Sequence, residues 1–178
     1  MRSIFFTVLI SFFLSANAQV DAFQKDIVTF ININGTRQLY DNSQDEITEK
    51  LKNQIVKKEI PTKEWKKFKN KNKKENLDKL VNDLAFAYRN QFSHDDVKKM
   101  MVFYKTEAAQ KLINDKSSLT EEDDKVIDDF NKTAIAKKMD LKEKALEKDI
   151  AVIYSAWKRD IFSQKMGEII KNGYSKAE

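Results

Sequence analysis

Residues that interrupt helices are almost missing from this chain, which has three glycines and one proline among 178 residues. Chains that fold into β-sheets use glycine, proline and similar residues at their many tight turns. Here apolar residues instead recur three and four positions apart, and charged residues, 34% of the chain, fall between them. The sequence therefore predicts an all-α protein whose amphipathic helices turn their charged faces to solvent.

We expect a helical bundle of five to six helices. A first helix begins near residue 22 and ends at Gly35, because glycine is favoured directly after a helix. A second helix covers roughly residues 36–58. Pro61 separates it from a third helix over about residues 62–90, since the residue before a proline resists the helical conformation.

Two capping motifs mark the later helices. Ser93-His94-Asp95-Asp96 opens a fourth helix, and Thr120-Glu121-Glu122-Asp123 opens the last helical region. That region is long and runs to about Asn172, with two apolar stripes that are shifted relative to each other. We expect a break or bend near residues 138–142, because so long a helix is unusual in a compact domain. The alternative is one continuous helix that buries two adjacent faces.

Residues 1–18 have the three parts of a cleavable signal peptide. Arg2 provides the positive charge, residues 4–14 form an apolar run, and Ala16-Asn17-Ala18 supplies small residues for the peptidase. The apolar run is about half of the roughly 20 residues that span a bilayer. We predict cleavage between Ala18 and Gln19 and export to the periplasm or the medium. The alternative is a retained N-terminal membrane anchor.

Residues 19–178 then have the length of a single helical domain. The chain has no cysteine, which excludes disulfides and a lipid attached to cysteine. No stretch after the signal peptide is long and apolar enough to span a membrane, so we expect no membrane span after cleavage.

Residues 92–113 read FSHDDVKKMMVFYKTEAAQKLI. This stretch resembles a bacterial family known as domain of unknown function 2059, whose members carry a phrase of the form F-Y-[RK]-S-P-x-G-[QK]. The matching residues are Phe103, Tyr104, Lys105, Gln110 and Lys111, while Thr106, Glu107 and Ala109 replace the family's Ser, Pro and Gly. The resemblance extends over residues 22–115 and leaves residues 116–178 as a long C-terminal helical region without a named relative. It implies an exported helical protein with no established activity.

The family-like phrase indicates a structural corner formed by Phe103, Tyr104, Lys105 and Thr106. Thr106 is suited to cap a new helix, and Glu107 in the first turn favours the positive end of the helix dipole. Phe103 or Tyr104 would hold this corner against the core. The alternative is that Tyr104 and Lys105 belong to a binding site.

The sequence contains no catalytic, cofactor or metal motif. His94 is the only histidine, cysteine is absent, and three glycines cannot supply a phosphate-binding loop. The acidic cluster over residues 121–129 is explained by its position at a helix N-terminus. We therefore expect a protein that is not an enzyme and needs no cofactor. The alternative is a hydrolase on a helical scaffold that uses two carboxylates to cleave an envelope polymer.

Residues 57–75 form a lysine-rich segment with nine lysines and three glutamates, in a chain whose net charge is only +5. Such a segment suits contact with anionic lipid or with an acidic envelope polymer, and export argues against nucleic acid. The candidate contact residues are Lys63, Trp65, Lys66, Lys67, Phe68, Lys69, Lys71, Lys73 and Lys74. The alternative is a solvated helix whose Trp65 and Phe68 pack on the bundle.

The sequence is also compatible with two other kinds of partner. A protein partner is one, and a second copy of the chain is the other. A homodimer would use apolar residues of the C-terminal region, namely Trp157, Ile161, Phe162, Met166 and Ile169. Taken together, the sequence predicts an exported, non-enzymatic interaction or envelope-associated module of unassigned activity.

Overall fold

The computed structural model describes residues 22–56 and 59–175, and these residues are mostly α-helical and form no β-sheet. The predicted all-α class is confirmed. The predicted signal peptide and its cleavage site between Ala18 and Gln19 lie outside the described residues, as do residues 57 and 58 of the lysine-rich segment.

A helix over residues 22–33 is followed by seven further α-helices, more than the five to six predicted. They are α2 (Thr36–Ile55), α3 (Thr62–Asn70), α4 (Lys73–Gln91), α5 (His94–Tyr104), α6 (Glu107–Asn114), α7 (Glu121–Asn131) and α8 (Ala134–Lys171), with a short 3₁₀ helix at Lys116–Ser118. The number differs because short connections divide segments that the sequence presents as continuous.

One of these divisions separates α3 from α4, which were expected to form a single helix. Lys71 is extended, and Asn72 takes the left-handed conformation with φ 57°. Asparagine adopts this conformation more readily than most residues because its short polar side chain bonds locally. The chain therefore turns without a glycine or a proline.

The predicted break near residues 138–142 is wrong, because α8 is helical without interruption from Ala134 to Lys171. The break falls earlier, where Lys132 ends α7 and the Thr133 hydroxyl accepts a hydrogen bond from the Ala136 amide. The residues of the shifted apolar stripe therefore belong to two different helices. Its first residues belong to α7, and Leu141 in α8 is 83% exposed.

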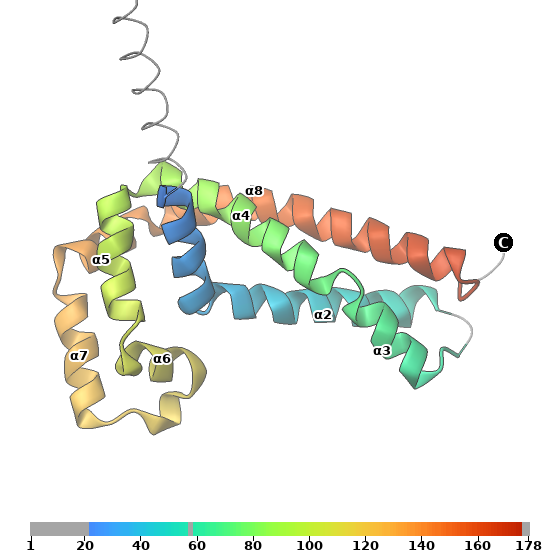
Figure 1. Ribbon diagram of the computed structural model, residues 1–178, viewed down its shortest axis with the longest axis horizontal. Coiled ribbons are helices and arrows are strands. Elements are labelled where there is room, and N and C mark those ends of the chain that lie inside the picture. Colours follow the sequence, from blue (N-terminus) through green and yellow to red (C-terminus); the bar gives the residue numbers. More distant parts are fainter. Residues whose placement is uncertain (1–21, 57–58, 176–178) are drawn as a thin grey trace, which may run out of the picture.

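Helix α8 runs along the long axis of the molecule and packs against α4 and α2 (Figure 1). Trp157, Ile161 and Ile169, three of the five residues considered for a dimer surface, are buried in this core, whereas Phe162 and Met166 are exposed. Helix α3 lies at one end of the molecule, and α5, α6 and α7 lie at the other (Figure 1).

Among the described residues, no helix combines the length and the apolar composition that crossing a membrane requires.

Candidate functional site

The inner face of α3 is fixed to the body of the protein by its aromatic residues. Trp65 is 7% exposed, and its indole Nε1 donates a hydrogen bond to Glu49 on α2 at 3.0 Å. The Phe68 ring stacks on Trp65 with ring centroids 5.0 Å apart. Both side chains are therefore used for packing, which is the alternative that the sequence left open.

Lys165 on α8 joins this packing from within the core. It has no exposed surface, and its ammonium lies 2.7 Å from the carbonyl oxygen of Phe68 and 3.0 Å from that of Lys71. The same ammonium is 4.8 Å from the Phe68 ring centroid. Burial lowers the pKa of Lys165 below its usual value. A cation placed at these carbonyls complements the negative end of the α3 dipole.

Four lysines of the lysine-rich segment are engaged in ion pairs with other helices or within α4. Lys69 lies 3.4 Å from Asp45, Lys71 lies 3.1 Å from Glu168, and Lys73 lies 2.9 Å from Asp45. Lys74 pairs with Asp78 one turn along α4 at 2.6 Å. Burial by itself would lower the pKa of Lys73, but the hydrogen bonds that its ammonium donates to Asp45 and Asp41 outweigh this effect and raise the pKa.

Three lysines differ from these four. Lys63, Lys66 and Lys67 are exposed, and no acidic group among the described residues lies within ion-pair distance of them. They stand at positions i, i+3 and i+4 of α3, so they share one helix face. We call this set the α3 lysine face. It points away from Trp65 and Phe68, and it is the part of the predicted contact segment that is free to meet a partner.

The family-like phrase lies where α5 ends and α6 begins. The Thr106 hydroxyl caps α6 by accepting a hydrogen bond from the Ala109 amide at 3.2 Å. Phe103 is 7% exposed and stacks on Phe130 of α7 with ring centroids 3.9 Å apart. Tyr104 meets Phe30 edge-on at 5.2 Å.

Gln110 has a role in this corner that the sequence did not indicate. Its Nε2 donates to the carbonyl oxygen of Tyr104 at 2.6 Å and to that of Ile33 at 2.9 Å. It thereby ties α6 to the end of α5 and to the first helix. Lys105, between these groups, is exposed.

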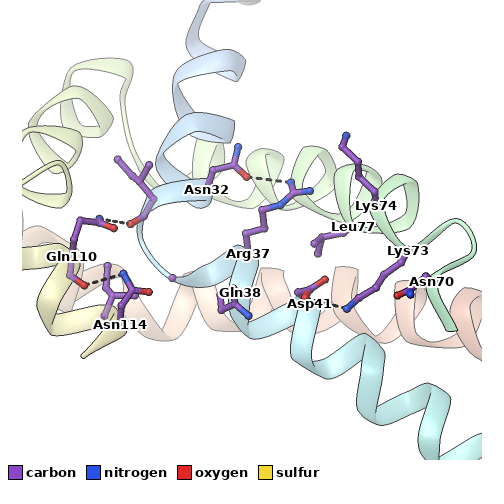
Figure 2. A pocket seen from close by; sticks show the side chains of 13 residues that line it. Asn32, Arg37, Gln38, Asp41, Asn70, Lys73, Lys74, Leu77, Gln110 and Asn114 are labelled. Carbon is purple, nitrogen blue, oxygen red and sulfur yellow. Dashed lines mark hydrogen bonds and ion pairs between the residues drawn. The ribbon is translucent and has the colours of Figure 1, made fainter. Parts of the chain in front are cut away.

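A polar pocket of about 500 Å³ runs along the first half of α2 (Figure 2). The first helix, α2, α3, α4 and α6 all contribute to its wall. Its lining residues are mostly polar, namely Asn32, Arg37, Gln38, Asp41, Asn70, Lys73, Lys74, Gln110 and Asn114, with Ile33, Gly35, Leu77 and Ile113 between them. Pockets of this size are typical of small-molecule sites. No motif in the sequence signals this one.

A second pocket, between α3 and the end of α8, bears on the hydrolase alternative because Glu64 and Glu168 both line it. Each carboxylate already has a partner. The Tyr174 hydroxyl donates to Glu64, and the Lys71 ammonium lies 3.1 Å from Glu168. This arrangement leaves neither carboxylate unengaged for acid–base chemistry. Among the described residues, no group of three His, Asp or Glu side chains is placed to hold a metal ion.

Comparison with known proteins gives one finding. Residues 78–137 match the family described as "Uncharacterized protein conserved in bacteria (DUF2059)". No curated protein and no solved structure matches the chain. The matched segment starts in α4, contains the corner between α5 and α6, and ends in the first turn of α8. The resemblance seen in the sequence is thus confirmed, with bounds that differ from those expected: residues 22–77 lie outside the match, and residues 116–137, for which the sequence named no relative, lie inside it.

Proposed function

We propose that this protein is exported and serves as a non-enzymatic interaction module, which contacts an anionic surface of the bacterial envelope through the α3 lysine face. The observation that carries the proposal is the division of the lysines. Lys69, Lys71, Lys73 and Lys74 have acidic partners, whereas Lys63, Lys66 and Lys67 share one exposed face without any among the described residues.

The absence of acidic partners in the described part of the chain matters because a paired lysine loses more free energy than an unpaired one when it leaves its surroundings to bind a phosphate. A lysine that is already paired must give up its carboxylate before it binds a phosphate, so it adds little net attraction. An unpaired exposed lysine gives up only water. Near an anionic membrane each such lysine contributes about 1 kcal/mol.

The aromatic residues define the kind of contact. Trp65 and Phe68 face the body of the protein and are not available to enter the acyl region of a bilayer. The contact is therefore electrostatic and lies at the surface, and added salt weakens it because the lysines are exposed. Anionic phospholipid headgroups are the partner that we propose.

Charge reversal of the α3 lysine face is expected to abolish this contact. Changing Lys63, Lys66 and Lys67 to Glu removes about 3 kcal/mol of attraction, which weakens binding to vesicles containing phosphatidylglycerol at least a hundred-fold. Sedimentation with vesicles at low ionic strength measures the effect.

The matched control reverses three exposed lysines of α8, Lys137, Lys144 and Lys148, which gives the same change in net charge. This control is expected to keep most of the binding, because its lysines lie outside the α3 lysine face. Equal losses in both variants would show that only net charge matters and would contradict the proposal.

Export has its own test. In the native host, the protein is expected in the envelope or the medium, with Gln19 as its N-terminal residue. Cell fractionation followed by N-terminal sequencing measures both properties. An intact N-terminus on protein retained in the cytoplasm would rule out export, whatever the vesicle experiment gives.

A further inference from the structure

The polar pocket of Figure 2 plays no part in the contact through α3 and suggests a second activity. Each of its charged residues lies in an ion pair, and the three cations Arg37, Lys73 and Lys74 meet the three carboxylates Asp41, Asp45 and Asp78. Arg37 lies 2.6 Å from Asp78, Lys74 lies 2.6 Å from the same carboxylate, and Lys73 lies 3.1 Å from Asp41. A ligand that enters the pocket therefore meets ion pairs rather than an unpaired cation or carboxylate.

The uncharged polar side chains of the pocket are all carboxamides. Five line the pocket, from Asn32, Gln38, Asn70, Gln110 and Asn114. Gln38 donates through Nε2 to Asn42, and Asn114 donates through Nδ2 to the Gln110 carbonyl oxygen. The side-chain oxygens of Gln38 and Asn114 accept no hydrogen bond from the described residues, and the side chain of Asn70 makes none with them. These groups are available to a ligand.

We infer that the polar pocket binds a neutral, hydroxyl-rich segment of a glycan. A carboxamide both donates and accepts hydrogen bonds, and so does a sugar hydroxyl. The carboxamides along the pocket can therefore pair with successive hydroxyls of a sugar chain. The ion pairs add further acceptors and donors without favouring a charged ligand. Figure 2 shows these groups distributed along α2, from Gln110 and Asn114 at one end to Asn70 at the other, which suits an extended oligosaccharide.

A peptide fits the pocket less well. Peptides are commonly recognised by pairing with a strand edge, by an apolar groove for a helix, or by aromatic residues that receive a proline-rich segment. The wall of this pocket is helical, contains no aromatic residue, and alternates Leu77 and two isoleucines with polar groups. The pocket therefore has none of the features that these three modes of peptide recognition require.

The test is a titration of the purified mature protein with three neutral oligosaccharides, the tetramers of N-acetylglucosamine, glucose and mannose, followed by NMR of the side-chain amide groups. We expect at least one of them to cause saturable shifts at Gln38 and Asn114. The double variant Gln38→Ala and Asn114→Ala should weaken binding at least ten-fold. Both residues are exposed, so the variant should fold. Asn53→Ala, an exposed amide at the far end of α2, should change nothing.

Salt separates this inference from the proposed function. Glycan binding should keep its affinity when NaCl is raised from about 0.05 M to 0.5 M, whereas the contact through the α3 lysine face should be lost. Three results would each overturn the inference: no saturable shift with any of the three tetramers, affinity that falls with salt, or equal shifts with an uncharged peptide.

Discussion

Replacing Gly35 with Ala is expected to lower the free energy of unfolding by about 3 kcal/mol. Gly35 connects the first helix to α2 with φ +85°, a conformation that costs an alanine energy. A Cβ at this position would also lie 2.9 Å from Cγ2 of Ile113 on α6. Ile113 cannot easily move aside, because a β-branched side chain in a helix has one strongly preferred rotamer. Thermal unfolding should show a melting temperature lower by about 6–12 °C.

The chain contains two controls that separate the causes of this effect. Gly173 also has a positive φ, +69°, but a Cβ there would meet nothing within 4 Å, so Gly173→Ala should show only the smaller backbone cost. Gly167 lies within α8 with open space around it, and Gly167→Ala should stabilise the protein by about 0.5–1 kcal/mol. Equal losses at Gly35 and Gly173 would contradict the contact with Ile113.

Replacing Lys165 with Met is expected to cost about 3 kcal/mol of stability, because the carbonyl oxygens of Phe68 and Lys71 lose their shared donor. Methionine fills a similar space without the charge. The loss should be concentrated at α3, so hydrogen exchange of the α3 amides should accelerate more than that of α4. Lys148→Met, an exposed lysine on the same helix, should be close to neutral. Uniform acceleration across all helices would argue against a specific link between α8 and α3.

The pH dependence gives an independent readout for Lys165. Burial lowers its pKa in the folded protein below the usual 10.5. Between these two values the unfolded chain binds the proton more tightly, so raising the pH through this window favours the folded state. The stability of the wild-type protein should therefore increase relative to that of Lys165→Met as the pH approaches 10.5. A difference that shrinks over this range would contradict the assignment.

The helical class follows from local sequence, and so do the caps at Ser93, Thr106 and Thr120, because a cap depends on residues within one turn. The turn at Asn72 could not be predicted, since nothing in its neighbours distinguishes it from a helical asparagine. The cap at Thr133 was also missed, and the break was placed too late. At Thr133 the only local indication of a new helix is a polar residue between two segments of helical periodicity.

The candidate site depends on contacts that the sequence does not show. The acidic partners of Lys69, Lys71 and Lys73 come from α2 and α8, far away in the chain. Unless the positions of these carboxylates are known, the sequence does not show which lysines are paired and which are unpaired. Two polar residues at core positions illustrate the same limit. Lys165 looks like any surface lysine until α3 is placed beside it, and Gln44 is 1% exposed although its amide finds no hydrogen-bond partner among the described residues.

The uninterrupted helix α8 also sets a distance. Lys138 in its second turn pairs with Asp96 of α5, and Lys165 near its other end holds α3. At 1.5 Å per residue, these two anchors are separated by about 40 Å. In salt of about 0.1 M, electrostatic forces decay over about 10 Å. The α3 lysine face and the acidic helix α7 therefore lie at opposite ends of the molecule, several screening lengths apart (Figure 1). The two ends can thus carry opposite charge without one cancelling the electrostatic field of the other.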